Sequence, residues 1–166
     1  TLEPVASSAT NNIYRIPSWQ QNESLILEYR KAHGLYDTTL PDDGLLVYRL
    51  NSQVEGNADG PPDELYIYRP GANDTTTNGM LSQAAMSMQN LRTMITEYTI
   101  PSGFSSLNTP GGLYLYNVGF AGDTISFDVR ITDVQLTTPS GGEAWFSGTN
   151  KQITWISKTN QGTVKL

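Results

Sequence analysis

The sequence predicts an all-β fold: a predominantly antiparallel β-sandwich, followed by part of an immunoglobulin-like β module. Strand-like runs of β-branched and aromatic residues are short, and Gly, Pro, Asn or Asp bounds each of them. Charged residues make up only 16 % of the 166 residues, a composition typical of loop-rich β proteins outside the cytosol. Alternation is clearest at Ile125, Phe127 and Val129, where polar residues stand between the apolar ones, as in a half-buried antiparallel strand.

Six of these runs are expected to form three consecutive antiparallel pairs. They are, pair by pair, residues 12–16 with 24–30, 45–50 with 64–69, and 113–118 with 124–131. The stretch FAGDT between the last two runs is a glycine-bearing hairpin loop.

One segment departs from the strand pattern. In MLSQAAMSMQNLRTMI, the apolar residues Ala84, Met88, Leu91 and Ile95 recur at helical spacing. Ala and Met favour helix, so we expect a short helix here. A strand and loop is the competing interpretation, because residues 93–100 are again rich in β-formers.

The stretch GLYDTTLPDDG precedes the third strand-like run and is rich in turn-forming residues. We expect Asp37 and LPDDG to shape a chain reversal, in which Pro41 fixes φ, one of the two following Asp residues caps the turn, and Gly44 supplies flexibility. The strand that follows should bury either the even-numbered or the odd-numbered residues of 45–50.

A domain boundary is expected near Asp133. Residues 1–132 form the predicted sandwich domain, and residues 133–166 restart strand-turn-strand with PSGG as the turn. About thirty residues are too few for an independent sandwich, so we interpret them as the first strands of a truncated second module.

Composition and charge exclude several classes of function. The net charge is −6 and the 10 basic residues are thinly spread, so we expect no nucleic-acid partner. No apolar run approaches the roughly 20 residues of a membrane-spanning helix, so no membrane span is expected. The chain has no Cys, which leaves no disulfide and no thiolate metal site.

An acidic loop, VEGNADGPPDEL, gathers hard oxygen donors. They are Asn57, Asp59, Asp63 and Glu64. Ca²⁺ prefers such ligands on flexible loops, so the loop is a predicted Ca²⁺ site, and Ca²⁺ is the only cofactor that the sequence indicates. A solvated acidic loop without metal is the competing interpretation.

Two further features carry weaker signals. His33, in KAHGLYD, is interpreted as a solvated turn residue; a Ser-His-Asp site with Ser24 or Ser52 is the less favoured alternative, because no Gly-x-Ser-x-Gly elbow is present. The stretches LYIYR and LYLYN alternate aliphatic residues with Tyr, so one sheet face could present a tyrosine row to carbohydrate; ordinary cross-strand pairing is the competing explanation.

Several spaced motifs then occur together: EYR at 28–30, GLYD at 34–37 and LPDDGLL at 40–46. With DELYIYRPG and GGLYLYNVGFAGDTISFDV, they resemble the region after the catalytic core of immune-inhibitor-A-like secreted zinc metallopeptidases, over roughly residues 5–131. The tail, PSGGEAWFSGTNKQITW, is similar to the opening of an immunoglobulin-like repeat of large bacterial surface and secreted proteins.

The resemblance implies an extracellular or cell-surface protein of bacterial type. Such peptidases bind zinc through His-Glu-x-x-His, and this chain has a single His, His33. We therefore expect no enzyme activity in this chain, and a non-catalytic accessory β domain that supports the peptidase core or contacts its substrate. Its partner would be the catalytic domain of the same parent chain or another extracellular protein. A carbohydrate- or surface-binding module and a structural subunit of an extracellular assembly are the alternatives.

Overall fold

The structure is a computed structural model in which residues 1–72, 79–131, 134–139 and 142–157 are described. The chain divides into two compact units, Thr1–Ile131 and Thr132–Leu166, and each is described by itself. The fold class is all-β with antiparallel sheets. No helix of the described residues is both long and apolar enough to cross a membrane.

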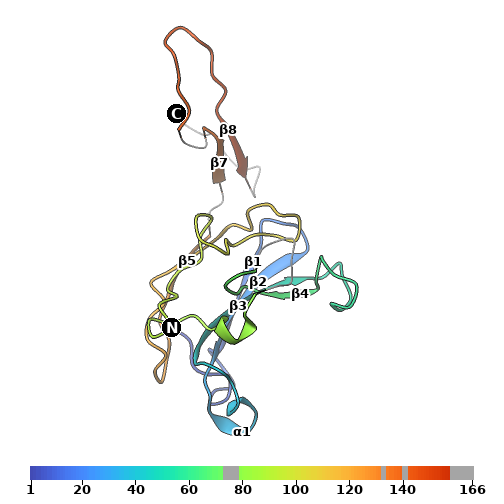
Figure 1. Cartoon of the computed structure of the whole chain (residues 1–166), viewed down its shortest axis with the longest axis vertical. Helices are drawn as coiled ribbons and strands as arrows, with labels where there is room; N and C mark the ends of the chain where they lie inside the picture. Colours follow the sequence, from blue (N-terminus) through green and yellow to red (C-terminus); the bar gives the residue numbers. More distant parts are fainter. Residues whose placement is uncertain (73–78, 132–133, 140–141, 158–166) are drawn as a thin grey trace. The chain divides into compact units, whose positions relative to one another are not determined.

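A four-stranded antiparallel sheet is the largest element of the first unit (Figure 1). Its strands are β1 (Ile13–Pro17), β2 (Glu23–Arg30), β3 (Gly44–Asn51) and β4 (Leu65–Ile67). They lie in chain order, each hydrogen-bonded to the next. The first two predicted pairs are thereby confirmed, with Tyr14 opposite Leu27 and Leu50 opposite Leu65.

A second, two-stranded sheet pairs β5 (Leu113–Tyr116) with β6 (Asp128–Ile131), antiparallel, and confirms the third predicted pair, although both strands are shorter than expected. Ile125 lies before β6 and forms an isolated bridge with Leu2 near the start of the chain. Ile125 is fully buried, whereas the polar residues that alternate with it are exposed. The predicted alternation is therefore confirmed.

One hydrophobic core holds this unit together. Its buried residues are Leu2, Ile16, Leu25, Leu27, Tyr29, Leu45, Val47, Tyr66, Tyr68, Ala72, Met86, Ile95, Phe104, Leu113, Leu115, Val118 and Ile125. In β3 the odd-numbered residues Leu45 and Val47 point into this core, so the structure selects the odd set of the two sets that the sequence left open.

The helix expected over residues 80–95 is wrong. The segment contains only a three-residue 3₁₀ turn, η1 (Leu81–Gln83). Met86 exchanges backbone hydrogen bonds of 2.8 and 2.9 Å with Leu45 of β3, and Ile95 exchanges two of 2.9 Å with Leu115 of β5. The backbone groups of Met86 and Ile95 are satisfied by distant strands, and a turn at 88–91 lies between them, so tertiary pairing overrides the helix propensity of the segment.

The helix α1 (Gly34–Asp37) is a single turn between β2 and β3, at one end of the four-stranded sheet (Figure 1). It belongs to the stretch that we predicted as a turn. Gly34 has φ +83°, a left-handed conformation that favours glycine, and it begins this reversal.

The second unit contains one antiparallel pair, β7 (Val134–Thr138) with β8 (Thr154–Ser157), which has a register shift between Leu136 and Thr138. The expected PSGG turn lies partly outside the described residues, since residues 140–141 are not described. The immunoglobulin-like character of residues 133–166 stays a prediction.

Candidate functional site

A buried ionic network connects the end of β2 to α1. Arg30 donates to Glu28 Oε1 at 2.7 Å and also to Asp37 Oδ1, and the hydroxyl of Tyr48 donates to Glu28 Oε2 at 2.6 Å. The side chains of Glu28 and Asp37 are only 11 % and 4 % exposed. The hydrogen bond to Glu28 raises the pKa of Arg30, and burial raises the pKa of Tyr48. One guanidinium thus compensates two buried carboxylates, and it joins the EYR and GLYD motifs.

The structure shows what three residues of the turn-rich stretch before β3 contact. Asp37 binds Arg30, and it also takes part in the reversal, because its carbonyl accepts a hydrogen bond of 3.0 Å from the backbone N–H of Leu40. Asp43 accepts a hydrogen bond of 2.6 Å from the backbone N–H of Ala32, so it ties the stretch to the end of β2. A Cβ on Gly44 would lie 2.6 Å from the carbonyl oxygen of Met86. Gly44 is therefore required for close backbone approach and not for flexibility.

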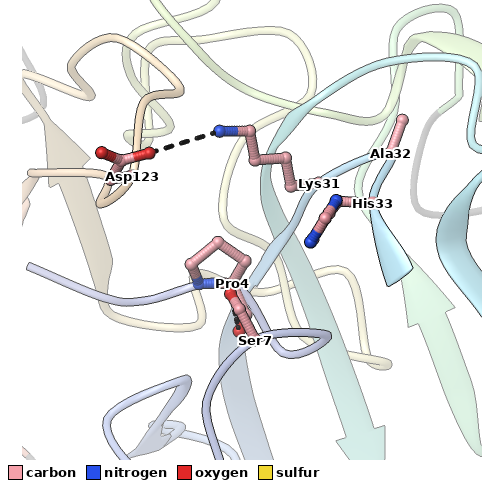
Figure 2. Close-up of a pocket in the computed structure, with 6 residues that line it drawn as sticks. All are labelled: Pro4, Ser7, Lys31, Ala32, His33 and Asp123. Atoms are coloured by element: carbon pink, nitrogen blue, oxygen red, sulfur yellow. Dashed lines mark hydrogen bonds and ion pairs between the residues drawn. The ribbon is translucent and has the colours of Figure 1, made fainter. Parts of the chain in front are cut away.

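Figure 2 shows an open pocket of about 480 Å³ near the start of the chain. Its lining residues are Pro4, Ser7, Lys31, Ala32, His33 and Asp123. Lys31 Nζ lies 3.8 Å from Asp123 Oδ1 and donates to the carbonyl of Gly122 at 3.0 Å. Tyr29 donates to the same carbonyl at 2.6 Å. Burial, with the charges of Asp43 and Asp123, raises the pKa of Tyr29 to about 12. These contacts fasten the loop before β6 to β2.

His33 is exposed in this pocket, as expected of a turn residue, and stands at the start of α1. The two serines considered for a triad bond elsewhere: Ser24 accepts from Arg15 Nε at 3.0 Å, and Ser52 donates to the carbonyl of Asn22.

The structure instead brings Ser7, His33 and Asp123 to one pocket. Ser7 donates to the carbonyl of Pro4, and Figure 2 draws no hydrogen bond from His33 to either residue. A base that activates a serine comes within hydrogen-bond reach of it, and no hydrogen bond joins His33 to Ser7 among the residues drawn in Figure 2.

The predicted calcium ligands lie in the loop before β4, and two of them bind the backbone. Asn57 makes two hydrogen bonds with Leu65, of 2.7 Å to its carbonyl and 3.0 Å from its N–H. Glu64 Oε2 accepts from the N–H of Gly56 at 2.7 Å. Both side chains therefore hold the loop closed on itself.

The other two predicted ligands differ in exposure. Asp63 is buried, and a Cβ on Gly60 would fall 1.8 Å from its Oδ1, so its carboxylate packs against that glycine. Asp59 is exposed. Within the described residues no three His, Cys, Asp or Glu side chains gather closely enough to hold a metal ion. The calcium site stays a prediction.

The tyrosine row that the sequence allowed as one of two interpretations is not exposed on β4. Tyr66 and Tyr68 are buried and pack edge-on against Phe104, with ring centroids 5.1 Å away in each case. In β5 the leucines are buried instead, and Tyr114 and Tyr116 lie outward. Because β4 buries its tyrosine and β5 exposes its own, the tyrosines of the two strands do not share an exposed face.

Two buried arginines were not anticipated. Arg49 of β3 lies with Cζ 5.1 Å from the ring centroid of Tyr66 and 5.6 Å from that of Phe104, and Arg69 lies 5.1 Å from Tyr66. Desolvated cation–π contacts of this kind contribute on the order of 1–2 kcal/mol each. The alternation of β3 indicates only that Arg49 lies on the same side as Leu45 and Val47, and the burial of that side shows that Arg49 is inward.

In comparisons with known proteins, no family model, no curated protein and no solved structure matches this chain. The resemblance to secreted metallopeptidases accordingly rests on the motifs quoted above, and the function that it implies is a proposal.

Proposed function

We propose that this chain is a non-catalytic accessory β module of a secreted, metallopeptidase-like protein, which supports the peptidase core or contacts its substrate. The proposal includes a sandwich architecture for residues 1–132 and an immunoglobulin-like character for residues 133–166. Two of the motifs that carry the resemblance meet in the Arg30–Asp37 ion pair, which supports a common structural role for them.

The observation that carries the proposal is the apolar tip of α1. Leu35 and Tyr36 are 82 % and 87 % exposed, although the next residue, Asp37, is buried. Large apolar side chains on a fixed backbone favour contact with another protein, because little ordering entropy is then lost on binding. The Arg30 network holds this turn in place, so the tip is a preorganised docking element.

The partner expected at this tip is the catalytic domain encoded upstream in the same reading frame. The test is a calorimetric titration of that domain with the present chain, in wild-type form and as Leu35→Ser with Tyr36→Ser. We expect the double variant to bind at least about tenfold more weakly, since each tenfold loss corresponds to about 1.4 kcal/mol. A matched control is Ile100→Ser, which removes an equally exposed apolar side chain from another loop.

Two results would contradict the proposal. One is a reading frame that encodes no peptidase domain, and the other is equal binding by the double variant and the wild-type chain. The purified chain alone should not cleave casein in the presence of Zn²⁺; chelator-sensitive cleavage by the pure chain would contradict its non-catalytic role.

A further inference from the structure

A second pocket contains an arginine that the backbone holds in a fixed position. Arg92 Nη1 donates to the carbonyl of Ala84 at 2.8 Å and to that of Gln83. Its own backbone N–H donates to the carbonyl of Ser87 at 3.2 Å. The side chain is half-buried. These contacts fix the guanidinium without using a carboxylate.

The charge of Arg92 has no ion-pair partner within the part of the chain that the structure describes. Burial lowers the pKa of Arg92. A desolvated guanidinium without a counter-ion is unfavourable, and an anionic ligand would relieve that cost with charge-assisted hydrogen bonds.

The pocket around Arg92 has a volume of about 290 Å³, close to the lower limit of roughly 300 Å³ for small-molecule sites. Its lining residues are Asp42, Gln83, Ala85, Asn90 and Arg92. One wall is therefore the turn-rich stretch before β3, and the other is the last residue of η1 with the segment that follows it. The amide nitrogen of Asn90 joins the walls, since it donates to the carbonyls of Asp43 at 3.5 Å and Ala85 at 3.3 Å.

The remaining polar groups of the pocket are mostly acceptors. Asp42 contributes a carboxylate, and Asn90 keeps its Oδ1, because its amide nitrogen is engaged by the backbone. A complementary ligand therefore carries one negative charge for Arg92 and neighbouring hydroxyl donors for the acceptors. The negative charge of Asp42 disfavours a second anionic charge on the ligand.

We propose that this pocket binds a hydroxyl-bearing monocarboxylate of the sugar-acid class, with Arg92 holding the carboxylate and Asp42 accepting from a ligand hydroxyl. This site is separate from the α1 tip and does not depend on the docking function proposed above. Arg and carboxylate are geometrically matched, because the planar guanidinium can donate two parallel hydrogen bonds.

The test is an NMR titration of the full 166-residue chain, labelled with ¹⁵N, at constant ionic strength. The measured quantity is the chemical shift of each backbone amide. The probes are sodium glucuronate, glucose and sodium sulfate. With glucuronate, we expect the amide chemical shifts of residues 42–44 and 83–92 to change and to reach saturation as its concentration rises. With glucose, we expect no change. Arg92→Gln should weaken glucuronate binding at least about tenfold, whereas Arg130→Gln, which changes an exposed arginine of β6, should leave it unchanged.

A second variant covers the case in which Arg92→Gln does not fold. Asp42 is exposed, so Asp42→Asn should leave the fold intact, weaken glucuronate binding and strengthen sulfate binding several-fold. The proposal is overturned if glucuronate shifts do not saturate, if glucose produces the same shifts, or if the Asp42 variant binds both anions as the wild-type chain does.

Discussion

Replacing Arg30 by Gln removes the cation of the ionic network and leaves the buried carboxylates of Glu28 and Asp37 without it. Breaking a buried ion pair by removing one partner costs about 3–5 kcal/mol, because an uncompensated charge remains. The Arg30 side chain is 30 % exposed, so solvent screens part of this effect. We therefore expect Arg30→Gln to lower the free energy of unfolding by about 2–4 kcal/mol at pH 7.

The neighbouring cation offers a matched control. Lys31 has almost the same side-chain exposure, 31 %, but its partner Asp123 is fully exposed and 3.8 Å away. Exposed pairs contribute about 0–1 kcal/mol, so Lys31→Gln should cost less than about 1 kcal/mol.

The assay is urea unfolding followed by the fluorescence of Trp19, in a background in which Trp145 and Trp155 are replaced by Phe so that the signal reports the first unit. A loss below about 0.5 kcal/mol at pH 7, or one no larger than that of the Lys31 variant, would refute the reasoning.

Three further predictions concern packing, pH and association. Gly112 has φ +81°, and an added Cβ would lie 2.2 Å from Trp19 Cδ1. Gly112→Ala should therefore lower the free energy of unfolding in urea by at least about 2 kcal/mol. The effect should be clearly larger than that of Gly56→Ala, since Gly56 has φ +74° but open surroundings. The folded-state pKa of Tyr29, about 12, lies above its usual value of about 10, so the stability from its neutral form is complete below pH 10 and is lost as pH rises through 12. Urea midpoints from pH 8 to 12 measure this loss, and a slope unchanged by Tyr29→Phe would contradict it. The described part of residues 134–157 forms only a two-stranded sheet, and such a sheet is marginally stable alone. It should therefore pair with another chain or pack on the first unit. Light scattering that shows a monomer, together with amides of these residues that are unprotected from hydrogen exchange, would exclude both.

The strand pairs could be predicted from the sequence because their causes are local. Each pair joins runs that are consecutive in the chain, and alternation such as that of Ile125, Phe127 and Val129 reports which face is buried without reference to distant residues. The turn residues between the runs limit their lengths to within a few positions.

The buried face of each strand and the long-range partners of each segment were harder to predict from the sequence. Alternation in β3 permitted either face to be buried, and contact with Met86, about forty residues away, decided for Leu45 and Val47. The same non-local pairing prevents a helix over residues 80–95, since backbone hydrogen bonds of Met86 to β3 and of Ile95 to β5 replace those of a helix.

The candidate functional features depended most strongly on the tertiary structure. The sequence placed Asp37 and Asp42 in a polar turn, where the ordinary interpretation is local turn chemistry. Only folding brings Asp37 to the guanidinium of Arg30 and sets Asp42 in one pocket with Arg92. Both contacts depend on distances in space. Arg30 and Asp37 are seven positions apart but belong to different elements, and Asp42 and Arg92 are fifty positions apart, so strand alternation encodes neither distance.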